Sequence, residues 1–279
     1  MTIVIFIILG LLNAVEATTT ISRRAGYSIG NAASGLIFQS SLSLLSRALI
    51  FMFMPILGVL ADTNSLLNSN NEVLVYSLFT PFFLVFVYLF RFKLESVFGH
   101  LLMNINDFGT YFKKSKKKYS VELVSSNLNR KKSYSFYFVV LLAYIPYYLS
   151  WPIIIVLLDK YNESRGLILG LSSVFNGLNT IAITLWIDPR LAKLGMYKNL
   201  ILRIYSDLLF VRIFSSIIAF LIFRQQQQKW LKYYFKFSLL LLIVIPILWI
   251  VKIQLFPIAI IPLLILLFTR YLFLSKSMK

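Results

Sequence analysis

The sequence predicts an all-α fold, a polytopic helical bundle embedded in a membrane. Apolar residues make up 59% of the 279 positions, and the mean hydropathy is +0.80. A soluble domain needs a polar surface that this composition does not supply. The apolar residues also gather into runs long enough to cross the roughly 30 Å hydrocarbon core of a bilayer, which takes about 20 helical residues.

The apolar runs predict six core spans in residues 1–223 and about two further segments in a C-terminal extension, 224–279. A secretory signal is the alternative interpretation of the first run, but no basic residue precedes that run. The runs lie at 2–19, 31–61, 73–90, 134–158, 166–187, 207–223, 237–251 and 254–273.

The distribution of Lys and Arg predicts the orientation. Ten basic residues lie in 91–132, none in 62–72 and two in 159–165. Because cytoplasmic connections are enriched in basic residues, we expect 94–132 to be cytoplasmic, and the N-terminus and the two other connections to be external. The same rule leaves two alternatives at 207–223. This run either dips into the membrane and returns, or crosses it as a short helix and places Arg224 outside.

The basic loop contains a predicted interfacial helix. Its apolar residues recur at helical spacing, with Glu95, His100, Asn104 and Asp107 on the other side; they are Leu94, Val97, Phe98, Leu101, Leu102, Ile105, Phe108 and Phe112. Such a helix lies in the headgroup plane. The lysines of 113–118 then either bind anionic lipids or act only as a solvated topology signal.

Arg47 stands alone in an otherwise uncharged run, 31–61. A charge at the membrane centre costs roughly 3 kcal/mol on insertion scales, so we expect Arg47 to face the protein interior and to meet an anion or a carboxylate. Ser40, Ser43 and Arg47 follow i, i+3, i+7 spacing and form a polar stripe that must point at other helices. An alternative role for Arg47 is a structural pair with Glu16.

Glu16 is the only carboxylate well inside an apolar run. It lies two helical turns before Arg23, so the two side chains share one helix face. We expect Glu16 to couple a proton or to neutralise an arginine. Arg24 lies beside Arg23 at the cytoplasmic end of the same run, where both residues either bind a ligand or only anchor topology.

A further polar cluster follows the run 166–187. Asp188, Pro189 and Arg190 form a predicted helix-end motif at the cytoplasmic interface, with Pro189 ending the helix. Arg212 lies within the next apolar run and is a second intramembrane arginine.

The composition argues against an enzyme, a metal site and a cofactor. The chain has no Cys and a single His, and its ten acidic residues are scattered, with no two on one apolar run forming a metal pair. No phosphate-binding loop with a Gly-Lys-Ser/Thr sequence occurs. The net charge of +18 lies mostly in short loops. This placement is typical of contact with lipid headgroups rather than with nucleic acid.

Three segments together resemble the Amj family of alternative lipid II flippases. They are Glu16-Ala17-Thr18 followed by Ser22 to Gly26, the run ending in Leu44 to Arg47, and Thr184 to Ala192 with Ile187-Asp188-Pro189-Arg190 at its centre. The resemblance covers about residues 1–223. The chain departs from the family at Phe38-Gln39-Ser40 and in the apolar runs that follow Gln228.

The resemblance implies a flippase that moves lipid II, an undecaprenyl-diphosphate-linked peptidoglycan precursor, to the outer leaflet of the cytoplasmic membrane. Arg47, Arg212, Arg23, Arg24 and Ser43 would bind the diphosphate, because the guanidinium fork bonds phosphate oxygens in pairs. A potential of about 100 mV, negative inside, would favour outward movement of two negative charges by roughly 4 to 5 kcal/mol. The alternatives are a membrane scaffold or assembly factor, and a transporter of another anionic polyprenyl-linked glycan.

Overall fold

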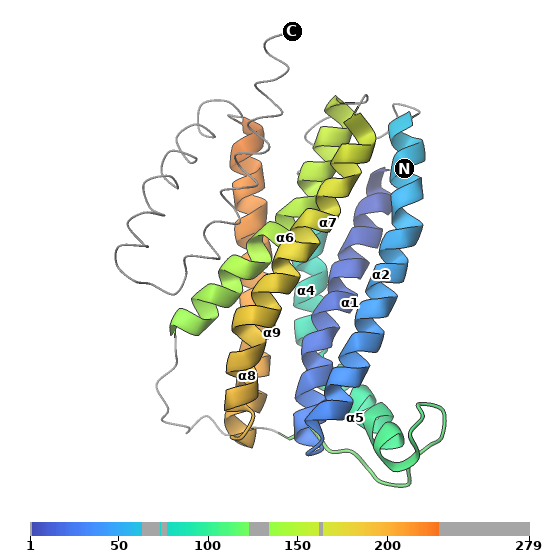
Figure 1. Ribbon diagram of the computed structural model, residues 1–279, viewed down its shortest axis with the longest axis vertical. Helices are drawn as coiled ribbons and strands as arrows, with labels where there is room; N and C mark the ends of the chain where they lie inside the picture. The colour runs from blue at the N-terminus through green and yellow to red at the C-terminus, as the bar shows by residue number, and fades with distance from the viewer. Residues whose placement is uncertain (1, 63–72, 74–76, 123–133, 162–163, 229–279) are drawn as a thin grey trace.

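The structure is a computed structural model that describes residues 2–62, 73, 77–122, 134–161 and 164–228 (Figure 1). Every regular element of the described residues is helical. In chain order these are α1 (Thr2–Ser28), α2 (Ala32–Asp62), α4 (Phe79–Leu89), α5 (Arg91–Phe108), α6 (Tyr134–Lys160), α7 (Arg165–Ala182), the π-helix η2 (Ile183–Ile187), α8 (Asp188–Leu194) and α9 (Lys198–Gln228).

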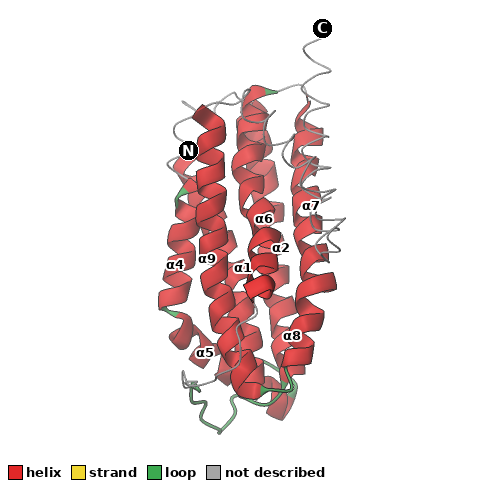
Figure 2. Ribbon diagram, turned by 90° about the vertical axis from the view of Figure 1, so that its left-hand side faces the viewer, coloured by secondary structure: helices red, strands yellow, loops and turns green. Residues whose placement is uncertain are grey.

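The long helices run side by side along one axis (Figure 2). In the described residues, 5 spans are long and apolar enough to cross a membrane: α1, α2, α6, the continuous α7–η2–α8 unit and α9. Helix α4 is a shorter apolar helix that runs along α1 and α9. The predicted fold class, a polytopic helical membrane bundle, is confirmed. The predicted apolar segments after Gln228 lie outside the described residues.

Helices α1 and α2 form a tight antiparallel hairpin. Gly30, in the turn between them, has a φ of +79°, which is unfavourable for residues that carry a side chain. The side-chain oxygen of Asn31 accepts a hydrogen bond from the backbone N–H of Ser34 at 3.1 Å and caps the start of α2. Gly26 and Gly35 then let the two backbones meet, since a Cβ on Gly26 would lie 2.6 Å from the Cα of Gly35. Small residues at a helix contact are a common packing device in membranes.

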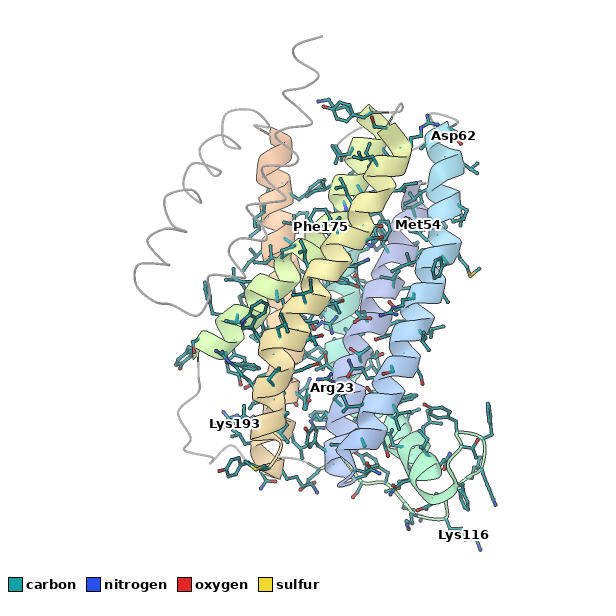
Figure 3. All side chains as sticks on the ribbon, in the orientation of Figure 1. Arg23, Met54, Asp62, Lys116, Phe175 and Lys193 are labelled. Atoms are coloured by element: carbon teal, nitrogen blue, oxygen red, sulfur yellow. The ribbon has the colours of Figure 1, made fainter. Side chains whose placement is uncertain are left out.

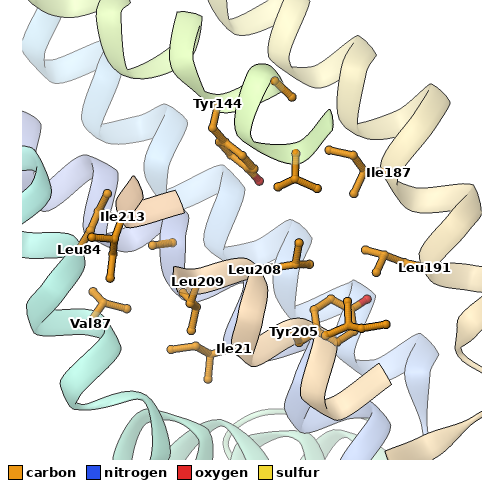
Figure 4. Packing of buried hydrophobic residues seen from close by; sticks show 14 of the residues in the cluster. Ile21, Leu84, Val87, Tyr144, Ile187, Leu191, Tyr205, Leu208, Leu209 and Ile213 are labelled. Atoms are coloured by element: carbon orange, nitrogen blue, oxygen red, sulfur yellow. The ribbon is translucent and has the colours of Figure 1, made fainter. Parts of the chain in front are cut away.

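Helix α1 lies at the centre of the bundle and contacts α2, α4, α5 and α9. Around its second half, buried residues of α4, α6, α8 and α9 form one apolar cluster, which Figure 4 shows with Ile21, Leu84, Ile187, Leu208 and Ile213. A second cluster surrounds its first half and includes Phe6, Phe53 and Trp151. Helix α2 packs mainly on α1, so much of its surface is exposed.

Basic residues from two separate segments of the chain lie at the same end of the bundle. Lys116 and Lys193 lie at that end and Asp62 at the other (Figure 3). The topology predicted from charge requires this arrangement, although the side of the membrane on which each end lies stays a prediction. Of the predicted external connections, 63–72 and 162–163 lie outside the described residues.

The predicted interfacial helix exists as α5, but its faces differ from the expectation. Glu95 and Asn104, predicted on the polar side of the helix, are buried, whereas Val97 and Phe108 of the predicted apolar side are exposed. The reason is an ion pair between Glu95 and Arg24 of α1, supported by a hydrogen bond of 2.9 Å from the Tyr119 hydroxyl to Glu95. The polar side of α5 therefore docks partly on the bundle.

Two helix ends also differ from the predictions. Pro189 does not end a helix, because the helical unit runs on from the π-helical turn η2 through α8 to Leu194. The short run 207–223 is part of α9, a helix of 31 residues that begins at Lys198. Because α9 is continuous and long enough to cross, the alternative in which this run dips and returns is not the one observed. Lys198 and Arg224 thus lie at opposite ends of one helix.

Candidate functional site

A polar pocket lies inside the bundle, among residues of the apolar cluster that surrounds the second half of α1. Its cavity volume is about 50 Å³, which is room for a few water molecules. Helices α1, α2, α6, η2, α8 and α9 all contribute to its wall, which consists of Glu16, Thr19, Thr20, Arg23, Gln39, Val140, Tyr144, Ile183, Ile187, Asp188, Leu191, Tyr205, Leu208 and Arg212. The pocket thus joins polar side chains that are far apart in the sequence. Figure 4 shows Tyr144, Ile187, Leu191 and Tyr205 converging from α6, η2, α8 and α9.

Helix periodicity explains the α1 side of the pocket. Glu16, Thr19, Thr20 and Arg23 follow i, i+3, i+4, i+7 spacing and therefore lie on one face. The expectation that Glu16 and Arg23 share a face is confirmed. On the opposite wall, the π-helical turn Ile183–Ile187 leads directly into Asp188. Single π-turns inside α-helices shift the register of the side chains that follow and are frequent at functional sites.

Arg23 makes the closest charge contact of the pocket. Its Nη1 lies 2.5 Å and its Nη2 3.0 Å from the two carboxylate oxygens of Asp188, and its Nε donates to the side-chain oxygen of Gln39. This paired geometry is the strong form of an arginine–carboxylate contact. It links α1, α2 and α8 at one point.

Arg212 is the largest fully buried side chain of the described residues, with 1% of its surface exposed. Its Nε donates to the Tyr148 hydroxyl at 3.1 Å, and its Nη1 donates to the Glu16 carbonyl at 3.1 Å and to the Thr20 hydroxyl at 3.2 Å. The guanidinium carbon lies 4.4 Å from the centre of the Tyr144 ring. The remaining nitrogen, Nη2, has no hydrogen-bond partner within the described residues.

The positive and negative charges on the pocket wall are equal in number when both carboxyl groups are ionised. Arg23 and Arg212 carry two positive charges, and Glu16 and Asp188 carry two negative charges when ionised. The carboxylate of Asp188 is paired, whereas no hydrogen bond or ion pair joins the Glu16 carboxylate to another described side chain. In this pocket, the Nη2 of Arg212 can therefore still donate a hydrogen bond, and the Glu16 carboxylate can still accept one. An anion that entered would compete with Asp188 for Arg23.

Other predicted site residues lie elsewhere. Arg24 does not line the pocket but is buried, in its ion pair with Glu95 and a hydrogen bond to the Leu202 carbonyl of α9. Ser43 is half-buried on α2, one turn after Gln39, and neither it nor Arg190 lines the pocket. Pro189 follows Asp188 and is exposed.

Arg47 corrects a prediction. We expected its side chain to face the protein interior, but it is exposed on α2 and does not line the pocket. Ser46, its neighbour, is the buried residue at this turn; Phe38 and Phe53 of α2 are also buried, with their rings against Phe98 of α5 and Trp151 of α6. The alternative role, a pair between Arg47 and Glu16, is not found within the described residues. The intramembrane arginine of the pocket is Arg212.

Several residues of the site were missed by sequence reasoning. Gln39 begins the polar cluster that ends at Arg47 but is not among the predicted site residues, and neither are Tyr144, Tyr148 and Tyr205. A signal existed for the first two tyrosines, since Tyr144, Tyr147 and Tyr148 follow helical spacing inside an apolar run. Tyrosine hydroxyls need a polar partner when they are buried. No group of three or more His, Asp or Glu side chains suited to a metal ion occurs within the described part of the chain.

The fold and the pocket define a multi-pass helical membrane protein. A family model described as the Lnb transmembrane domain matches residues 205–279, so α9 from Tyr205 onwards, including Arg212, is similar to part of that domain. Residues 229–279 of the match lie outside the described residues. No curated protein and no solved structure matches the chain. The match supports a membrane protein without singling out the Amj family.

Proposed function

We propose that the protein is a membrane transporter whose pocket binds the phosphate groups of a lipid-linked substrate. The resemblance to the Amj family suggests lipid II, moved from the inner to the outer leaflet of the cytoplasmic membrane. The observation that carries the proposal is the meeting of Arg23 and Arg212, from two helices, in one polar pocket within the bundle. Burying two arginines costs desolvation and adds little stability, which favours a functional reason for their presence.

The chemistry of the pocket suits a diphosphate. Arginine stays charged at any relevant pH, and its planar fork binds phosphate oxygens in pairs. Arg23 would exchange the carboxylate of Asp188 for a phosphate, and the free Nη2 of Arg212 would donate to a second phosphate. The hydroxyls of Thr19, Thr20 and Tyr205 line the same space. The cavity of about 50 Å³ has room for only a few water molecules, so the phosphates would enter as the surrounding side chains move apart. The sugar and peptide parts of lipid II would require helices to separate further.

The driving force does not require a nucleotide in this proposal. An inside-negative potential moves an anion outward, by about 2.3 kcal/mol per charge and 100 mV. Glu16 would neutralise the arginines in the empty state and be displaced or protonated when the anion enters, so that the pocket does not accumulate negative charge.

A membrane scaffold is the competing function. One observation favours it, because Arg23 is already paired with Asp188 and Arg212 already makes three hydrogen bonds. Buried polar networks of this kind also occur as purely architectural contacts. A scaffold would need the folded pocket but would transport no lipid.

Transport in liposomes separates the two functions. The full-length protein is reconstituted with a fluorescent lipid II analogue, and an impermeant reductant measures the analogue in the outer leaflet. We expect the wild type to move the analogue under an applied potential, and Arg212→Lys to slow it at least about tenfold, because an ammonium loses the paired hydrogen bonds. Lys117→Gln, at an exposed pair with Asp107, is the matched control. If the folded wild-type protein does not move the lipid II analogue, the proposed transport function is wrong.

A further inference from the structure

Arg47 is an exposed guanidinium halfway along a helix that spans the membrane. Helix α2 has 31 residues, which corresponds to about 46 Å, and Arg47 lies near its centre. The side chain has no hydrogen-bond or ion-pair partner within the described residues. Charged residues inside membranes pair with an opposite charge or line a pathway, so Arg47 needs an anion from outside this part of the bundle.

The described carboxylates do not supply that anion. Those with partners are used elsewhere, in the contacts Asp62–Arg165, Glu95–Arg24, Asp107–Lys117, Glu122–Lys198, Asp188–Arg23 and Asp207–Tyr137. Glu16 lines the pocket, and Asp159 is exposed at the end of α6. Residues 229–279, which lie outside the described part, contain no Asp or Glu in their sequence. The two other carboxylates, Glu72 and Glu163, belong by sequence to the connections 62–72 and 159–165. A counter-charge at the membrane centre therefore has to arrive from the bilayer.

The depth of Arg47 restricts the kind of anion. Resident phospholipid headgroups lie at the surfaces of a hydrocarbon core about 30 Å thick, and a position near its centre is roughly 15 Å from either surface. A lipid phosphate reaches that depth only while it crosses. The anion that suits Arg47 is thus the phosphate of a lipid in transit.

The polar side chains of α2 lead from Arg47 to the pocket. Gln39, Ser43 and Arg47 lie at i, i+4 and i+8, so successive residues are about 6 Å apart along the helix and turn by about 40° around it. Gln39 lines the pocket and accepts a hydrogen bond from Arg23. Ser43 is half-buried, with no hydrogen bond from its hydroxyl within the described residues, and Arg47 is exposed. The row therefore passes from the protein interior to the lipid-facing side.

The rest of this side of α2 suits a hydrocarbon tail. Leu36, Leu44 and Phe51 are exposed apolar residues on the same helix, with 48%, 63% and 78% of their surfaces accessible. Helix α2 packs mainly on α1, so no other described helix covers this face along its length. A lipid could keep its tail in the bilayer here while its phosphates contact the polar row.

From these observations we infer that Arg47 is a second phosphate-binding position, on the lipid-facing side of α2, which passes the phosphates of a crossing lipid to or from the Arg23–Arg212 pocket through Ser43 and Gln39. The inference rests on the proposed transport function and adds a lateral route to it. The ligand class is a polyprenyl lipid with an anionic phosphate or diphosphate. The route lies outside the pocket and shares with it only Gln39.

The test uses liposomes that contain this chain alone and compares the wild type, Arg47→Gln and the control Met52→Gln. Met52 is an exposed residue of the same helix, 71% accessible, so its variant controls for placing an amide on the lipid-facing surface. Outward movement of a fluorescent polyprenyl diphosphate is measured together with binding of inorganic diphosphate to the solubilised protein. The soluble anion reports on the pocket without the membrane route.

We expect Arg47→Gln to slow lipid movement at least about tenfold, the effect of losing one charge-assisted contact, with diphosphate binding unchanged. Met52→Gln should behave as the wild type. If Arg47→Gln moves the lipid at the wild-type rate, the inference is wrong, and the partner of Arg47 is then another protein or none. Loss of both diphosphate binding and thermal stability would show a structural contact instead. Failure of the wild type itself to move the lipid would refute the proposed function.

Discussion

Replacing Asp188 by Asn should tighten the binding of a phosphate anion in the pocket. Asp188 holds both terminal nitrogens of Arg23, at 2.5 and 3.0 Å. An entering anion has to displace this carboxylate before it can use the guanidinium fork. Asparagine has nearly the same shape but no charge, so the variant removes the competitor and keeps the packing.

The expected size of the effect follows from the exposure of the pair. Two unit charges about 4 Å apart interact by about 4 kcal/mol at an effective dielectric constant of 20. The side chain of Arg23 is 13% exposed and that of Asp188 is 31% exposed, so solvent screens part of this attraction. If the Asp188 charge weakens the free energy of anion binding by a net amount of about 1.4 kcal/mol, the affinity changes tenfold. We therefore expect the Kd for inorganic diphosphate to fall about tenfold.

The assay is titration calorimetry of the solubilised full-length protein with inorganic diphosphate, at constant pH and ionic strength. Asp107→Asn is the control, because it removes a carboxylate from a more exposed pair, with Lys117, outside the pocket. The pKa of Asp107 is held below its usual value by the hydrogen bonds from Lys117 and then Ser115, so its side chain is ionised at neutral pH as the comparison requires. An unchanged or weaker affinity in Asp188→Asn, with the protein still folded, would refute the idea that the anion replaces this carboxylate.

Three further outcomes follow from the fold. Gly26→Leu should lower the unfolding temperature markedly, because its Cβ would meet the Gly35 backbone at 2.6 Å and backbone cannot rotate away. Arg24→Gln should cost about 3 to 5 kcal/mol in the free energy of unfolding, since it leaves the Glu95 carboxylate buried without its charge partner. A thiol introduced by Ser115→Cys should react with an impermeant reagent only after the cells are permeabilised, because residues 94–132 are predicted to be cytoplasmic.

Each of these outcomes has a matched control. Gly58→Leu should leave the unfolding temperature nearly unchanged, because a Cβ at Gly58 meets nothing within 4 Å. Lys117→Gln should have little effect on stability, because the side chain of Lys117 is 67% exposed. A thiol from Ser164→Cys should react from outside intact cells, and the chain has no cysteine of its own to confuse the labelling. Reaction of the thiol at 115 from outside would reverse the predicted orientation.

The sequence alone determined the class of the protein and much of its organisation. Long apolar runs require helices in a membrane, because every backbone polar group there must be satisfied within the chain. The long basic loop and the motif at Asp188 to Arg190 were both expected on the cytoplasmic side, and Lys116 of the loop and Lys193, just after the motif, do lie at one end. The shared face of Glu16 and Arg23 also followed from the sequence, because residues seven apart always meet on one side of a helix.

Only the tertiary structure decided which arginine lies inside. Arg47 and Arg212 both occur within apolar runs, and periodicity within one helix does not say which side another helix covers. Helix α2 packs on α1 at Gly35, buries Phe38 and Ser46 and leaves Arg47 exposed, whereas α9 turns Arg212 towards α1 and α6. The pairing of Arg23 with Asp188, 165 residues later in the chain, is likewise set by packing. Contacts between distant segments depend on how whole helices pack, which no local pattern of residues specifies.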